Sequence, residues 1–102
     1  IAQRSFLEEN ADAAAAFLAE YKASVDFVTE PANLDAAAAL VVQAGILPKE
    51  PVAKAALPQC GITFLSGEEM KKTASGFLAV LYAADPKSVG GALPDEGLYY
   101  LR

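Results

Sequence analysis

The stretch Ser66–Pro86, SGEEMKKTASGFLAVLYAADP, decides the fold class of this chain. Its first four residues form an S-x-x-E capping box, in which serine and glutamate side chains satisfy free backbone N–H groups at a helix start. Apolar residues then recur at helical spacing, at Met70, Ala74, Phe77 and Leu81. Proline ends the pattern, because the residue before it avoids helical backbone angles. The stretch predicts a helix over 67–84, and the capping box predicts a cost of about 1 kcal/mol for Ser66→Ala.

A second helix is predicted over 11–29, after a single turn at Ser5–Glu9. Asn10 is suited to be its N-cap, and Pro31 ends it. An amphipathic stripe runs along this helix at Leu18, Tyr21, Val25 and Val28.

Two shorter helices are predicted over 33–44 and 49–57. Asn33 is suited to cap the first, and Gly45 is a typical residue just beyond a helix end. Proline is tolerated in a first turn, so Pro51 is compatible with the second helix. The apolar face of the first is expected at Leu34, Ala37, Ala38 and Val41.

The only clear strand signal inside the chain is Ile62–Leu65, a short β-rich stretch. A lone strand is not stable, so it needs a partner, and the start of the chain at Ile1–Arg4 is the local candidate. The chain is therefore predicted to be mainly α, with about four helices and at most one or two short strands.

Composition limits the size of the core. The 102 residues fit one domain, and hydrophobic residues make up 54% of them. Much of that fraction is alanine, which forms helices well but fills a core poorly. We therefore expect the core to be built from Phe, Leu, Ile, Val and Tyr.

The charge of the chain excludes several partners. The net charge is −5, and the only adjacent basic pair is Lys71-Lys72. A nucleic-acid binder needs a basic face to neutralise phosphates, and an anionic membrane surface also attracts basic segments. Neither partner is expected. No apolar stretch approaches the roughly 20 residues that span a bilayer.

The residue inventory argues against catalysis. There is no histidine, which removes the commonest general base and the commonest metal ligand. Cys60 is the only cysteine, so no internal disulfide or thiolate metal cluster forms, and we interpret it as a small buried hydrophobe. We expect no enzyme activity, no catalytic residues, no metal site and no cofactor.

Three further features have plain structural interpretations. The pairs Glu8-Glu9 and Glu68-Glu69 are expected in first turns of helices, where acidic residues stabilise the helix dipole. Gly90-Gly91 lacks the spacing of a phosphate-binding loop and predicts a turn. Tyr99-Tyr100 is expected to dock the C-terminal segment onto the rest of the chain.

A resemblance to a known family runs over nearly the whole chain. It is carried by Pro58–Lys71 (PQCGITFLSGEEMK), by Ser75–Leu78, and by Asp85–Gly91 (DPKSVGG). With the closing Leu93–Tyr100 and the early Phe6–Asn10, these segments resemble the C-terminal part of ABC-importer substrate-binding proteins. The group concerned is the nitrate/sulfonate/taurine-like one, which includes relatives of thiamine-pyrimidine-synthesis proteins.

The resemblance implies that residues 1–102 are one C-terminal helical segment of a two-lobe, periplasmic-binding-protein α/β fold. Such proteins capture a small-molecule solute outside the cytoplasmic membrane, on its periplasmic or extracellular face, and deliver it to a permease. No ligand-binding residue of the family maps onto this chain by motif, so the solute is not identified. The alternative is a free-standing helical protein-interaction domain.

The first residues, Ile1–Arg4, read as an internal cut in a longer protein. A segment separated from its lobes exposes surface that a sheet once covered, and Ile62–Leu65 would then present an unpaired strand edge. We expect the isolated chain to self-associate, or to expose an apolar patch beside Phe64.

Overall fold

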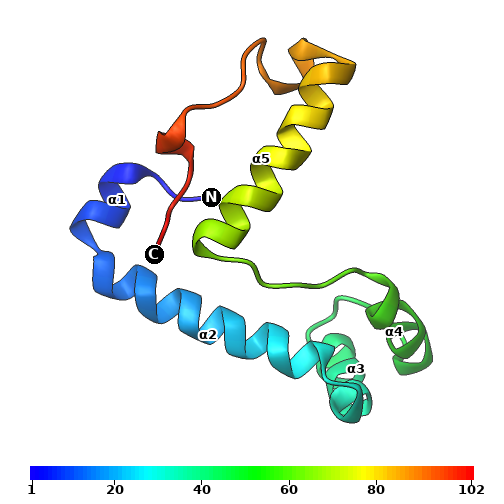
Figure 1. The fold of residues 1–102 in the computed structure, drawn as a ribbon. Helices are drawn as coiled ribbons and strands as arrows, with labels where there is room; N and C mark the ends of the chain where they lie inside the picture. The colour runs from blue at the N-terminus through cyan, green and yellow to red at the C-terminus, as the bar shows by residue number, and fades with distance from the viewer. The chain divides into compact units, whose positions relative to one another are not determined.

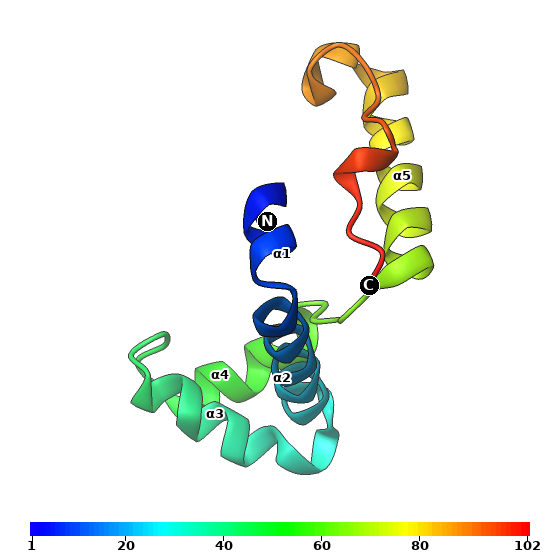
Figure 2. The same ribbon diagram turned by 90° about the vertical axis from the view of Figure 1, so that its left-hand side faces the viewer.

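The structure is a computed structural model that describes residues 1–102, and it divides into two compact units (Figures 1 and 2). Unit 1 is Ile1–Phe64 and unit 2 is Leu65–Arg102. Helices account for 72% of the residues and no strand forms, so the prediction of a mainly helical chain is confirmed. No helix combines the length and the apolar character needed to cross a bilayer.

Unit 1 is a succession of four α-helices and two short 3-10 turns. In chain order these are α1 (Arg4–Glu9), α2 (Ala11–Thr29), η1 (Pro31–Asn33), α3 (Leu34–Gln43), α4 (Glu50–Ala56) and η2 (Leu57–Gln59). The helices predicted over 11–29, 33–44 and 49–57 correspond to α2, α3 and α4, with ends that differ by at most one residue. Proline sets two of these boundaries, at Pro31 after α2 and at Pro51 in the first turn of α4.

Asn10 and Asn33 stand at the predicted helix starts but do not cap them. Asn10 Nδ2 donates to the Phe6 carbonyl of α1 at 3.1 Å, and Asn33 Nδ2 donates to the Phe27 carbonyl of α2 at 3.2 Å. The prediction that they cap the following helices is therefore wrong. Because consecutive helices are joined by very short links, each asparagine lies next to the unsatisfied carbonyls of the preceding helix, which accept its amide hydrogens.

Gly45 ends α3 as predicted. Its φ of 74° is a left-handed value that favours glycine. The Gly45 N–H donates to the Val42 carbonyl at 2.9 Å, and the Ile46 N–H donates to the Val41 carbonyl at 3.1 Å. This pair of bonds is a Schellman motif, which satisfies two of the carbonyls left free at the end of the helix.

The core of unit 1 is made almost entirely of alanine. The buried residues are Ala14 and Val25 on α2, Ala37 and Ala38 on α3, and Ala53 on α4. The expectation of a core built from large side chains is wrong. Alanine side chains are short enough to let two helix backbones approach closely, and α3, which carries Ala37 and Ala38, packs against α4, which carries Ala53.

Unit 2 is one long helix followed by an irregular tail. It contains α5 (Gly67–Ala84), with the bounds predicted from the sequence, and the 3-10 turns η3 (Pro86–Val89) and η4 (Glu96–Leu98). An ion pair between Lys71 on α5 and Glu96 on η4 joins the tail to the helix. The backbone N–H of Lys87 donates to Asp85 Oδ1 at 3.0 Å, which caps η3.

No residue of unit 2 is buried. Along α5 the half-buried positions include Met70, Ala74 and Leu81, as predicted, but Phe77 is exposed and Leu78 is half-buried instead. In α2, likewise, Tyr21 is the exposed member of the predicted stripe. The helical period alone therefore did not determine whether these two aromatic rings are buried.

The predicted strand at Ile62–Leu65 does not form. Its predicted partner is also absent as a strand, because Arg4 is already the first residue of α1. A strand exists only as a member of a hydrogen-bonded ladder, so a β-rich stretch without a partner stays irregular.

Ser66 precedes α5 with extended backbone angles, φ −142° and ψ 169°, but its side chain forms no capping hydrogen bond. The backbone alone begins the helix, with the Met70 N–H donating to the Ser66 carbonyl at 3.2 Å. The capping-box bond predicted from the sequence is therefore not present.

We predict that Ala53→Leu destabilises the chain by about 1–3 kcal/mol, because the extra side chain has no room between α3 and α4. Urea unfolding followed by circular dichroism measures the change. Ala55→Leu is the matched control, since Ala55 is exposed on the same helix and should shift stability by less than about 0.5 kcal/mol. Equal effects of the two substitutions would contradict the alanine core.

We predict that Ser66→Ala changes the free energy of unfolding by less than about 0.5 kcal/mol, not by the 1 kcal/mol of a lost cap. Asp85→Ala is the comparison, because it removes a real side-chain cap and should cost about 1 kcal/mol. Urea midpoints of both variants provide the measurement. A larger loss of stability for Ser66→Ala than for Asp85→Ala would show that the Ser66 side chain does cap α5.

Candidate functional site

A hollow in unit 1 is large enough to hold a small molecule. Its volume is about 390 Å³, which lies in the range of ligand sites. It is formed where α2 ends, between the residues that follow α2 and those around η2. The lining residues are Val28, Thr29, Glu30, Pro31, Leu34, Leu57, Pro58, Gly61 and Ile62.

Helix-ending residues build the two sides of the hollow. On one side Pro31 stops α2 and starts η1, which turns the chain into α3 at Leu34. On the other side Pro58 lies in η2, and Gly61 follows with a φ of 63°, a left-handed value that redirects the chain towards Ile62. The walls are therefore mostly apolar side chains held at the ends of helices.

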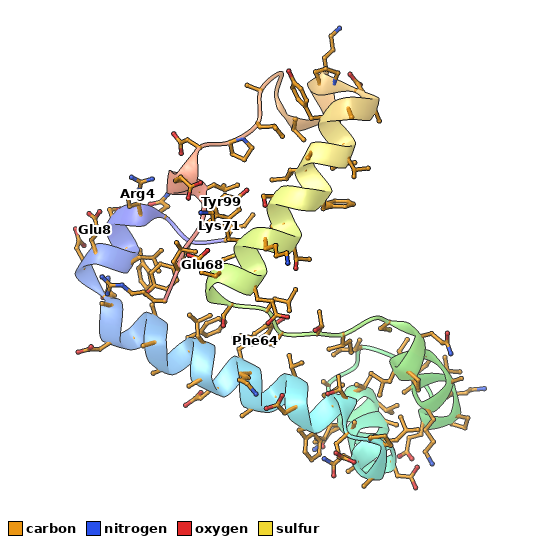
Figure 3. All side chains as sticks on the ribbon, viewed as in Figure 1. Arg4, Glu8, Phe64, Glu68, Lys71 and Tyr99 are labelled. Atoms are coloured by element: carbon orange, nitrogen blue, oxygen red, sulfur yellow. The ribbon has the colours of Figure 1, made fainter.

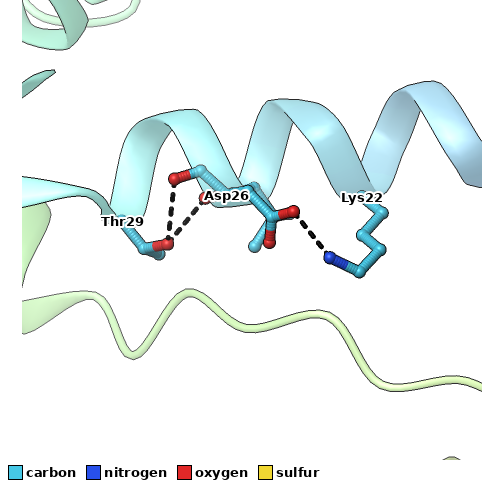
Figure 4. Close-up of polar contacts among 4 residues, drawn as sticks. Lys22, Asp26 and Thr29 are labelled. Atoms are coloured by element: carbon cyan, nitrogen blue, oxygen red, sulfur yellow. Dashed lines mark hydrogen bonds and ion pairs between the residues drawn. The ribbon is translucent and has the colours of Figure 1, made fainter.

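The polar groups at the end of α2 are largely satisfied within the helix (Figure 4). The Thr29 hydroxyl donates to the Val25 carbonyl at 2.8 Å, which holds this side chain against its own helix. One turn earlier Lys22 Nζ forms an ion pair with Asp26 Oδ2 at 2.6 Å (Figure 4). Both groups are exposed, so this pair adds little to stability.

Glu30 is the only charged residue that lines the hollow. Its Oε1 accepts from the Ala32 N–H at 3.5 Å, a long contact that orients the carboxylate at the start of η1. The carbonyl end of α2 adds partial negative charge at the same place. The hollow thus combines apolar walls with a negative rim, and no lysine or arginine lines it.

Two other ion pairs hold lysines outside the hollow. In unit 1 Lys54 Nζ lies 2.9 Å from Asp35 Oδ1, and the hydrogen bond to Asp35 raises the pKa of Lys54. In unit 2 the hydrogen bond to Glu96 raises the pKa of Lys71. Tyr99 lies beside Lys71 in this unit (Figure 3). Both pairs connect neighbouring elements of one unit.

Cys60 is exposed, so the interpretation of a buried hydrophobe is wrong. It stands at the end of η2, where its thiol donates to the Ala56 carbonyl at 3.2 Å. A residue that closes a surface turn has no second element above it to bury it. Cys60 does not line the hollow, although its neighbour Gly61 does.

The two glutamate pairs occupy different ends of their helices. Glu68 and Glu69 lie in the first turn of α5, as predicted. Glu8 and Glu9 end α1, because that helix already begins at Arg4, and the prediction for this pair is wrong. Gly90 and Gly91 form a turn after η3, with φ values of 82° and 89°, as predicted.

Aromatic side chains gather on one side of α2. Phe17 and Tyr21 stack with ring centroids 5.9 Å apart, and Phe64 meets Tyr21 at 5.9 Å in a tilted arrangement. Phe64 lies beside α2 in Figure 3. Phe17 and Tyr21 remain 65% and 51% exposed. We call these three residues the aromatic cluster.

In unit 2 Tyr99 and Tyr100 are half-buried, which is compatible with a docked C-terminal segment.

No group of three or more metal-ligating side chains comes together in the structure. Comparisons with protein-family models, characterised proteins and solved structures found no match for this chain.

Sequence reasoning did not identify Thr29 and Glu30 as site residues; it used this region only to place a helix end. The usable signal was the pair of helix-stopping prolines, Pro31 and Pro58, which lie within a few residues of Val28, Leu34, Leu57 and Ile62. Which two helix ends face each other is decided by packing of α3 against α4, and that packing was not predictable from spacing.

Proposed function

We propose that these residues are the C-terminal helical part of a two-lobe α/β solute-binding protein of an ABC-type importer. In this role the protein captures a small molecule on the periplasmic or extracellular face of the cytoplasmic membrane. It delivers the molecule to the permease through the larger protein. It binds without catalysing a reaction, and it has no nucleic-acid partner.

The observation that supports one part of the proposal, that more protein covers these residues, is the uncovered apolar surface of α5. From Thr73 to Ala84 this helix has no charged residue, and Phe77 and Val80 are 64% and 66% exposed. A helix that is apolar over most of its circumference is stable when other protein covers it. The tail of unit 2 covers only part of α5, which supports the proposal that further protein covers this helix.

Two other observations support the same role. The family resemblance of Pro58–Lys71 and Asp85–Gly91 supplies the importer class, and it implies the missing lobes. The hollow beside Glu30 has the size of a small-molecule site, which agrees with solute capture. The sequence resemblance alone points to import, whereas the exposed surface points only to a covering partner.

The aromatic cluster favours the second candidate, a helical interaction domain. Exposed stacked rings at Phe17 and Tyr21 are typical of surfaces that bind another protein. In this alternative the partner is a separate chain, whereas in the importer proposal the covering protein belongs to the same gene product.

The coding region separates the two proposals. The importer proposal predicts a signal peptide and two βα lobes encoded upstream in the same frame, beside permease and ATPase genes. A start codon directly before Ile1 would contradict it and would favour the interaction domain.

We predict that the gene product containing these residues is stabilised by one class of solute. Nitrate, taurine and an aminopyrimidine are the probes, each tested in a thermal-shift titration against the same buffer and ionic strength. A ligand at 100 times its Kd raises stability by about 2.7 kcal/mol, because it binds only the folded state. Unchanged melting temperatures with all three probes would contradict this prediction and would exclude these three solutes.

We also predict that the isolated 102-residue chain self-associates or binds an apolar dye through its exposed rings. Sedimentation over a dilution series and dye fluorescence measure the two effects. Phe17→Gln should reduce both, while Ala19→Gln, on the other side of α2, serves as the control and should leave them unchanged. A monomeric, dye-silent chain at high concentration would show that no covering partner is needed.

A further inference from the structure

We propose that the hollow at the end of α2 binds an organic cation, a molecule with a compact apolar body and one ammonium group. The inference rests on the proposed solute-capture function in one respect, that the bound molecule is the transported solute. It narrows the solute, which the sequence left unidentified, to amines.

The shape of the hollow sets the size of the ligand body. A volume of about 390 Å³ accommodates a six-membered ring. Its walls come from Val28, Leu34, Leu57 and Ile62, with Pro31 and Pro58 between them. Burying a hydrocarbon ring against these side chains releases water from both apolar surfaces, which favours binding.

The rim of the hollow sets the charge of the ligand. Glu30 contributes a full negative charge, and its Oε2 accepts no hydrogen bond from the protein. The carbonyl end of α2, a helix of 19 residues, adds partial negative charge beside it. An ammonium group at this rim is attracted by both the Glu30 carboxylate and the helix end, whereas a nitrate or sulfonate is repelled.

No side chain of the protein already neutralises this rim. Lys22 pairs with Asp26, and Lys54 pairs with Asp35, so both lysines have carboxylate partners of their own. Neither lines the hollow. The Thr29 hydroxyl donates to the Val25 carbonyl, which leaves its oxygen free to accept from an ammonium N–H.

The experiment compares three ligands of one shape on the 102-residue chain. Cyclohexylamine, cyclohexanol and cyclohexanecarboxylate carry the same ring with a positive, neutral and negative group at neutral pH. Amide chemical shifts in two-dimensional NMR report binding. We expect saturable shifts at Thr29–Leu34 and Gly61–Ile62 with the amine, about fivefold weaker binding of the alcohol, and no saturable shifts with the carboxylate.

Glu30→Gln provides the decisive variant, because glutamine keeps the oxygen that accepts from the Ala32 N–H but removes the charge. This substitution should weaken binding of the amine about fivefold and leave binding of the alcohol unchanged. Glu20→Gln is the matched control, since Glu20 is an exposed glutamate of α2 outside the hollow, and it should change neither.

Three results would overturn the inference: equal affinity for the amine and the alcohol, equal effects of Glu30→Gln and Glu20→Gln, or no saturable shift at these amides. Any of these results would remove the support that the hollow gives to solute capture, but the importer proposal itself is decided by the coding region. The reverse outcome is also distinguishable. If the gene product binds the amine at the hollow but has no upstream lobes, the proposed amine site stands and the importer proposal is wrong.

Discussion

The direct contact between α3 and α4 is the constraint on which unit 1 depends. Ala38 and Ala53 are fully buried there, with Ala37 beside them, and no large side chain is buried anywhere in the chain. Because alanine leaves almost no space between the helix backbones, the relative position of α3 and α4 is closely defined. That position places η2 and Pro58 against the end of α2, and the hollow lies between them. The candidate site is thus a consequence of the alanine packing.

The sequence predicted where helices begin and end far better than which side chains they bury. Pro31, Gly45 and Pro86 set boundaries through local backbone chemistry, so α2, α3 and α5 were found within one residue. The asparagines at helix junctions were assigned to the wrong helix. An Asn10 or Asn33 amide can serve the carbonyls behind it or the N–H groups ahead of it, and the geometry of the short link makes that choice.

Burial depends on contacts between distant residues, and the sequence predicted it only in part. The apolar face expected for α3 is confirmed by the burial of Ala37 and Ala38, but other predictions of burial were wrong. Large residues such as Phe77 and Tyr21 were expected inside by periodicity, yet alanines form the core because helix pairs without intervening bulk pack most closely. The stretch Ile62–Leu65 has the residue types of a strand but lacks a partner to form a ladder with. The hollow beside Glu30 was missed for the same reason, since its two sides come from residues nearly 30 positions apart.

Native-state amide hydrogen exchange tests most directly whether the alanine contact holds the fold together. Protection reports the free energy of local opening, and it is highest in the elements that unfold last. We predict that the slowest-exchanging amides belong to α3 and α4 around Ala38 and Ala53. We also predict that α5, which has no buried residue, exchanges much faster. Protection in α5 equal to or greater than that in α3 and α4 would contradict this account.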